Sequence, residues 1–186
     1  MKNSKFVSRA GEKLDFALNY FNIEVENKII LDLGSSTGGF VDCLLQRRAG
    51  KVYSVDTAKM MLNNKLKLNP RVEVIVGNAV HVQVGQVDVI TIDVGWTRQE
   101  LIIPNALKNL KIGGDIVSLI KPQYEAERRW LTKGVVEKMF LEKTLEKVKV
   151  NLSKFDNLEI KSIIESPLKG GKGKNIEYLM WCKKVR

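Results

Sequence analysis

A chain of 186 residues, 44% of them hydrophobic, is long enough for one domain with a substantial buried core, and two full domains would not fit comfortably. Lys and Arg number 31 against 21 Asp and Glu, and the resulting net charge of +10 favours a polyanionic partner. No apolar run reaches the roughly 18 residues of a membrane span, and residues 1–13 lack the apolar core of a signal peptide. We therefore expect a soluble, cytoplasmic protein.

The rarest reactive side chains exclude several kinds of site. Cys43 and Cys182 lie far apart in the sequence, and neither has metal-ligand spacing around it. We expect both thiols to be reduced and no metal to be bound. His81 is the only histidine, so a Ser-His-Asp triad or a His-rich metal site would depend on it alone, and no catalytic role is expected for it.

The first predicted element is a helix that begins near Ser8. Leu14, Ala17, Leu18 and Phe21 recur with the spacing of one buried helix face, and Ser8 is a suitable N-cap.

Short runs rich in Val and Ile alternate with helical patterns after this helix. The predicted strands cover residues 28–34, 51–56, 72–76, 87–93 and 115–121; the predicted helices cover 40–48, 59–68 and 98–110, with a turn at 111–114. Such alternation is typical of a parallel sheet with helices on both faces.

The C-terminal part breaks this alternation. A long amphipathic helix is predicted over residues 132–152, followed by strands at 158–164 and 175–182 that a loop at 165–174 connects. Two strands without an intervening helix favour an antiparallel hairpin at the sheet edge. We expect an α/β, Rossmann-like fold of about seven strands in a single domain over residues 1–186.

A glycine-rich turn follows the first strand, where open parallel sheets bind their ligands. Its glycines allow the backbone to approach a ligand closely. The predicted cofactor-binding residues of this turn are Asp32, Gly34, Ser35, Ser36, Thr37, Gly38, Gly39 and Phe40.

Three classes of ligand could use this turn. A P-loop would need a lysine, which the turn lacks, and a nicotinamide fingerprint would need glycine at Ser36. S-adenosylmethionine needs an acid for the ammonium of its methionine part, and Asp32 is placed for that. Asp56, 22 residues beyond Gly34, is spaced to accept hydrogen bonds from ribose hydroxyls. Nicotinamide enzymes share this acid, so an NAD-dependent oxidoreductase remains an alternative.

Five segments in a fixed order resemble a known family. They are residues 8–14 (SRAGEKL), 31–40 (LDLGSSTGGF), 91–94 (TIDV), 121–125 (KPQYE), and 166–170 (SPLKG) followed by 175–177 (NIE). Together they resemble the TlyA-type RNA methyltransferases, a group within the FtsJ-like ribose 2′-O-methyltransferases, and the resemblance spans residues 6–179. It implies a class I methyltransferase fold, S-adenosylmethionine as cofactor, and a cytidine of ribosomal RNA as the methylated nucleotide.

The resemblance also implies a catalytic tetrad. The family's Lys-Asp-Lys-Glu set matches Lys13, Asp93, Lys121 and Glu177, so residues 1–27 would contribute to the active site. The sulfonium methyl is already activated, so the enzyme must mainly align the hydroxyl oxygen and manage one proton. Lys121 is expected nearest that hydroxyl, either as a base or as a cationic stabiliser. Asp93 could also face the cofactor, and Asn78 is expected near its adenine.

Basic residues near these segments are expected to bind RNA phosphates. They are Arg9, Arg128, Arg129, Lys169, Lys172 and Lys174. Trp130 could stack on an unpaired base. A non-catalytic RNA-binding module remains a further alternative.

Two features depart from the family pattern. Members usually carry a small N-terminal RNA-binding domain, whereas seven residues precede Ser8 here, so we expect that domain to be absent. Gly95 and Trp96 stand where Ser-Phe is expected and could alter how the target nucleoside is held. Some relatives carry a haemolysin label, but the lack of a membrane span argues against direct lytic activity.

Overall fold

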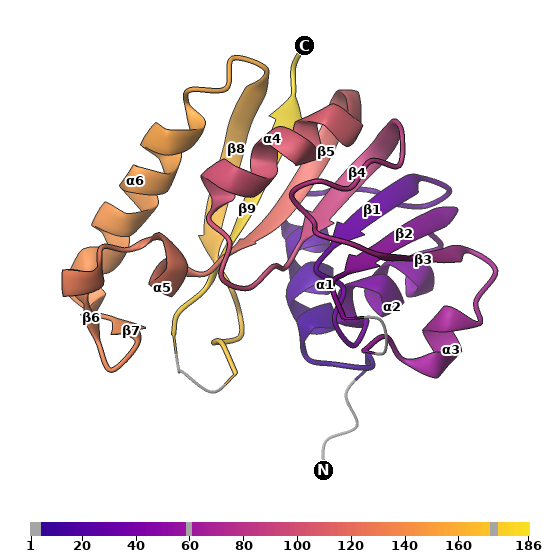
Figure 1. Cartoon of the computed structure of the whole chain (residues 1–186), viewed down its shortest axis with the longest axis horizontal. Coiled ribbons are helices and arrows are strands. Elements are labelled where there is room, and N and C mark those ends of the chain that lie inside the picture. The colour runs from indigo at the N-terminus through magenta and orange to yellow at the C-terminus, as the bar shows by residue number, and fades with distance from the viewer. Residues whose placement is uncertain (1–4, 59–60, 172–174) are drawn as a thin grey trace.

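Figure 1 shows the computed structural model, which describes residues 5–58, 61–171 and 175–186. Seven strands form one sheet in the order β3-β2-β1-β4-β5-β9-β8. Their bounds are β1 Ile29–Leu33, β2 Lys51–Asp56, β3 Val72–Val76, β4 Val87–Ile92, β5 Leu110–Ile120, β8 Leu158–Glu165 and β9 Tyr178–Lys184. All neighbours pair in parallel except β5 with β9 and β9 with β8. The predicted α/β sheet with an antiparallel closing hairpin is confirmed.

Helices cover both faces of the sheet (Figure 1). The longer ones are α1 Ala10–Tyr20, α2 Gly39–Gln46, α4 Gln99–Asn109 and α6 Leu141–Leu152; the short ones are α3 Asn64–Lys67 and α5 Pro122–Glu125. One core cluster joins α1 and α2 to the sheet, and a second joins α4 and α6 to its other face. Each face buries Val, Ile and Leu side chains, which explains the nearly continuous apolar strands of the sequence.

The predicted helix over residues 132–152 is wrong in its first half. Short 3-10 turns, Arg128–Trp130 and Lys138–Phe140, flank a small hairpin of β6 Leu131–Thr132 and β7 Val135–Val136, and α6 begins only at Leu141. Lys133 and Gly134 between these strands have φ of 50° and 77°, which a right-handed helix cannot accommodate.

Three other boundaries differ from the predictions. The helix expected over 59–68 is only α3 among the described residues, because Asn63 caps it by accepting from the Lys65 amide at 2.9 Å. Residues 111–114 are not a separate turn but bulge within β5, since Val87 pairs with Leu110 and Val89 with Asp115. Strand β9 begins at Tyr178, which leaves residues 175–177 in the preceding loop.

The expected side-chain cap of the first helix is absent. The N-cap position of α1 is Arg9 and no side chain caps it; Ser8 instead accepts through its carbonyl oxygen from the Gly11 amide at 3.1 Å. No described helix is long and apolar enough to cross a membrane.

Candidate active site

The carboxyl ends of the parallel strands meet along one edge of the sheet, where the predicted site residues gather. Strand β1 pairs with β2 on one side and with β4 on the other. The chain therefore leaves β1 and β4 in opposite directions along the sheet, which opens a crevice beyond their ends.

Gly34 brings two backbones together at this crevice. Its φ is 90°, and a Cβ there would lie 2.7 Å from the carbonyl oxygen of Asp93. Only glycine combines this dihedral angle with so close an approach. The Asp93 amide donates to the Leu33 carbonyl at 2.9 Å, so the ends of β1 and β4 are held against each other.

Asp32 lies beneath the turn and is 1% exposed. One carboxylate oxygen accepts from the Thr91 hydroxyl at 2.6 Å, and the other is buried without a partner among the described residues. Burial raises the pKa of Asp32 to about 7; hydrogen bonds from Thr91 and Ser35 lower it, and Asp93 and Asp56 add a smaller upward contribution. An unsatisfied buried carboxylate oxygen fits a cationic ligand group.

Asp56, at the end of β2, organises the turn itself. Its two carboxylate oxygens accept from the amides of Ser36 at 2.8 Å and Ala58 at 2.9 Å. Each oxygen retains a further lone pair, so Asp56 can still accept from a ligand hydroxyl.

A cavity of about 450 Å³ opens above these residues, within the usual range for ligand pockets. Its lining includes six of the predicted site residues: Gly34, Ser36, Asp56, Asn78, Asp93 and Lys121. The Asn78 side chain accepts from the Val80 amide at 3.1 Å, which shapes the loop after β3.

The other predicted residues of the turn do not line this cavity. Ser35 and Asp32 are buried beneath it, Thr37 is exposed, and Phe40 is 3% exposed in the core. Gly38 packs beneath Leu66, and Gly39 lies against Ser8 and Gly11. These glycines serve the packing of α1, α2 and α3 around the turn.

The four tetrad residues form two ion pairs. Lys121 lies 2.7 Å from an Asp93 carboxylate oxygen and donates to the Val94 carbonyl at 3.1 Å. Lys13, on α1, pairs with Glu177, and both side chains are buried. Each cation thus has its own carboxylate.

The loop before β9 wraps around Glu177. The Ser166 amide donates to the Glu177 carbonyl at 2.8 Å, and a Cβ on Gly170 would lie 2.7 Å from the Glu177 carboxylate. This explains why the SPLKG and NIE segments occur together.

A second cavity of about 570 Å³ adjoins the first. The described residues that line it are Trp96, Lys121, Gln123, Tyr124, Leu131, Gly134, Gly170, Gly171, Asn175 and Glu177. Lys121 and Trp96 line both cavities. Each ion pair therefore contributes one residue, Lys121 or Glu177, to the lining of the second cavity.

Trp96 stands at the junction and is 87% exposed. Its ring packs on Tyr124 with the centroids 5.0 Å apart, and its φ is 63°. The sequence marked Trp96 only as a departure from the family pattern, and it did not single out Gln123, Tyr124 or Asn175. The helical assignment of residues 132–140 concealed the hairpin that completes this wall.

The predicted RNA-binding residues have different surroundings. Arg9, Arg128, Arg129 and Lys169 are exposed, and Arg129 pairs with Glu127 at 2.8 Å. Lys172 and Lys174 lie outside the described residues. The Trp130 ring is stacked on Phe140 at 5.4 Å and 8°, so that face is already covered.

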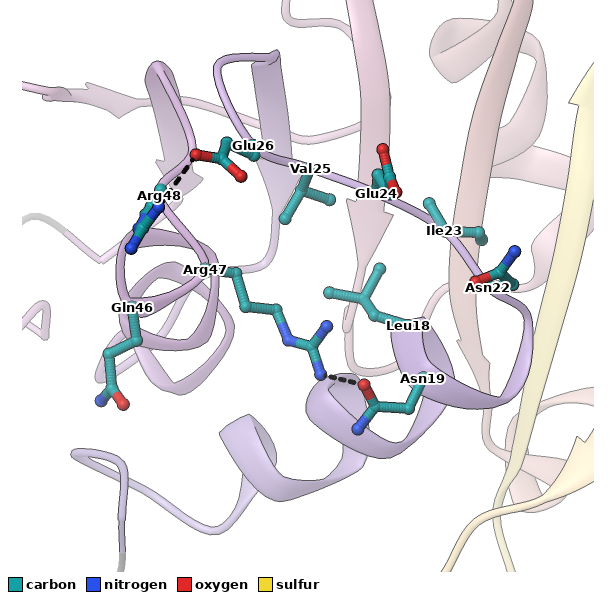
Figure 2. Close-up of a pocket in the computed structure, with 10 residues that line it drawn as sticks. All are labelled: Leu18, Asn19, Asn22, Ile23, Glu24, Val25, Glu26, Gln46, Arg47 and Arg48. Carbon is teal, nitrogen blue, oxygen red and sulfur yellow. Dashed lines mark hydrogen bonds and ion pairs between the residues drawn. The ribbon is translucent and has the colours of Figure 1, made fainter.

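A further cavity, of about 400 Å³, lies at the opposite edge, before β1 and β2 (Figure 2). Its arginines have partners: Arg47 donates to Asn19 at 2.6 Å, and Arg48 lies 3.2 Å from Glu26 (Figure 2). Arg47 also forms an ion pair with Asp15. None of the predicted site residues that the structure describes lines it. The catalytic candidates belong to the carboxyl edge.

The fold and the two joined cavities define a cofactor-dependent α/β enzyme with lysine and carboxylate groups where the cavities meet. The chain belongs to the FtsJ-like methyltransferase family, whose model matches residues 6–184. The predicted family and enzyme class are confirmed.

Named relatives agree with this assignment. Hemolysin A of Brachyspira hyodysenteriae is 42% identical over 96% of this chain and 77% of its own. The 16S/23S rRNA (cytidine-2′-O)-methyltransferase TlyA of Mycobacterium tuberculosis is 31% identical over 96% of this chain and 68% of its own. A solved structure from Streptococcus thermophilus, described as a hemolysin, has a TM-score of 0.94 at 37% identity and covers 99% of this chain and 69% of that one.

Replacing Asp32 by Asn should change how stability depends on pH. Because folding raises the Asp32 pKa from 3.8 to about 7, its stabilising contribution is full below about pH 4 and is lost as pH rises through 7. Asn does not ionise, so Asp32→Asn removes that loss. Between pH 5 and pH 8, the free energy of unfolding of the variant should rise relative to that of the wild type by on the order of 2 kcal/mol. Urea unfolding at several pH values measures this, with the exposed Asp156→Asn as control. Parallel pH profiles for wild type and Asp32→Asn would contradict the expectation.

Proposed function

We propose that this methyltransferase transfers a methyl group from S-adenosylmethionine to a ribose 2′-hydroxyl of ribosomal RNA, on a cytidine. The proposal rests chiefly on one observation: Lys121 lines both the cavity at the end of β1 and the adjoining cavity that contains Glu177. A group at that junction can contact a cofactor on one side and an acceptor on the other.

The first cavity suits S-adenosylmethionine. Asp56 lines this cavity and would accept from the ribose hydroxyls. Asp32, buried beneath the turn with one unpartnered oxygen, would attract the methionine ammonium electrostatically rather than by direct contact. Asn78 lies where the adenine would be held. The bound cofactor would supply a methyl group that its sulfonium charge already activates.

Lys121 would orient the acceptor oxygen. Two of its three N–H groups are directed to Asp93 and the Val94 carbonyl, which leaves one for the ribose hydroxyl. A lysine so placed acts as a cation that holds the oxygen and stabilises the negative charge that builds on it, while the hydroxyl proton passes to solvent water as the O–CH3 bond forms. Glu177 lines the second cavity and is held by its ion pair with the buried Lys13, so its carboxylate would hold the sugar in line.

The acceptor side suits an unstacked nucleotide. Trp96 presents an exposed ring at the junction, and a nucleobase could stack on it. TlyA of Mycobacterium tuberculosis is a 16S/23S rRNA (cytidine-2′-O)-methyltransferase, which supports ribosomal RNA and cytidine as the target here. A cytoplasmic location would follow from action on ribosomal RNA and is part of this proposal.

Substitution of Lys121 tests the reaction. Labelled methyl transfer to ribosomal subunits, followed by mapping of 2′-O-methyl positions, should detect wild-type activity on a cytidine. Lys121→Ala should lower the rate by at least about 100-fold, because the charge that stabilises the oxygen is lost. Its affinity for S-adenosylhomocysteine should stay within a few-fold of wild type.

The matched control is Lys108→Ala, an exposed lysine near the C-terminal end of α4. It should retain the wild-type rate. Full activity in Lys121→Ala would refute the role proposed for this lysine.

Calorimetry tests the cofactor. The wild type should bind S-adenosylhomocysteine and not NAD, because the turn carries Ser36 where a dinucleotide site needs glycine. Asp56→Ala should weaken binding by roughly 10- to 100-fold, the value of a hydrogen bond to a charged group. Asp156→Ala serves as the exposed control, and preferential binding of NAD would overturn the proposal.

A further inference from the structure

We propose that the β6–β7 hairpin binds the RNA backbone beside the methylated nucleotide, with Lys133 at its tip contacting a phosphate. This inference rests on the proposed function and deepens it by assigning part of the RNA contact surface to a segment that the sequence patterns placed in a helix.

The hairpin has a tight and well-defined turn. Leu131 pairs with Val136 and Thr132 with Val135, so Lys133 and Gly134 alone form the connection. Both have positive φ, 50° and 77°, as in the two-residue turns that match the twist of antiparallel strands. The Lys133 side chain is exposed at this turn.

The hairpin lines part of the second cavity, where the acceptor nucleotide is proposed to bind. Leu131 and Gly134 line the same cavity as Lys121 and Glu177. Lys133 immediately precedes the lining residue Gly134 and is exposed, so its side chain begins beside the rim of this cavity. A nucleotide that places its ribose at Lys121 would bring its neighbouring phosphates to this rim.

Asn175 attaches the hairpin to the loop before β9, which carries Glu177. Its side chain accepts from the Val136 amide at 3.1 Å and donates to the Gly134 carbonyl at 3.0 Å, and the residue is 5% exposed. Its own carbonyl accepts from the Gly170 amide at 2.9 Å. Since Glu177 follows two residues later, Asn175 positions the hairpin relative to the tetrad.

Packing at its base makes the hairpin a rigid support. Val136 joins Ala126 and Leu141 in a small core of their own. Trp130 and Phe140, which flank the hairpin, are stacked on each other, and the Glu137 amide donates to the Trp130 carbonyl at 3.0 Å.

The charges around the hairpin fit a phosphodiester. Glu127 is paired with Arg129, and Glu137 accepts from the Thr132 hydroxyl at 2.7 Å. Within the part of the chain that the structure describes, no ion pair engages Arg128, Lys133 or Lys138, which are all exposed. A lysine at a turn is a point charge suited to a phosphate rather than to a particular base.

The test is the affinity of the full chain for ribosomal RNA, measured by anisotropy at several salt concentrations. Lys133→Asn removes the charge and keeps a residue that tolerates positive φ. It should weaken binding about 3- to 10-fold at low salt and reduce the slope of log affinity against log salt by about 0.7 to 0.9. Lys133→Arg should restore both values.

The matched control is Arg48→Asn. Arg48 is also exposed, cationic and at a positive φ, 61°, but it lies at the opposite edge (Figure 2). The Arg48→Asn variant should leave the RNA affinity and the salt slope at wild-type values.

Asn175→Ala should raise KM for RNA and leave the affinity for S-adenosylhomocysteine unchanged.

Binding and methyl transfer separate the two proposals. Wild-type affinity and salt slope in Lys133→Asn would overturn the hairpin contact, even if methyl transfer is intact. Weakened binding in this variant supports the contact, whether or not the wild type methylates the RNA; absence of wild-type transfer counts against the proposed function alone.

Discussion

The contact between Gly34 and the Asp93 backbone controls the geometry of the whole site. The hydrogen bond from the Asp93 amide to the Leu33 carbonyl holds the ends of β1 and β4 together, and the absence of a Cβ at Gly34 allows this close approach at a φ of 90°. The same contact sets the floor of the first cavity and the place of the Asp93 carboxylate. Because Asp93 holds Lys121, this backbone approach also fixes the position of Lys121, which lines both cavities.

Ion pairing explains how this edge can hold so many charges. Lys13 is buried with Glu177, and Lys121 is directed to Asp93, so neither cation lacks a carboxylate. Buried ion pairs add little net stability relative to apolar residues of similar size, because desolvation offsets their attraction. Stability alone therefore does not explain why Lys121 lines both cavities and Glu177 lines the second. Asp32 differs, since one of its oxygens has no described partner and its pKa is raised.

Segments from the C-terminal half of the chain, together with Trp96, shape the second cavity. The loop from Ser166 to Gly170 wraps around Glu177, Asn175 holds the β6–β7 hairpin, and Trp96 stands on Tyr124 across the opening. These segments are distant in sequence and come together only because β9 inserts beside β5 in the antiparallel direction. Insertion of this strand carries Glu177 from the C-terminal region to the ends of the parallel strands.

The sequence by itself determined the sheet, the turn after β1 and the four tetrad candidates. Strands buried on both faces leave continuous apolar runs, and a tight turn requires its glycines locally. Tertiary structure alone decided which residues pair, that Gly38 and Gly39 support packing, and that residues 131–136 form a hairpin. Val135, Val136, Met139 and Phe140 have helical spacing, but the positive φ values at Lys133 and Gly134 and the hydrogen bonds from Asn175 stabilise a hairpin instead. Ion pairs such as Lys13 with Glu177 join residues 164 positions apart, and no local pattern encodes such a contact.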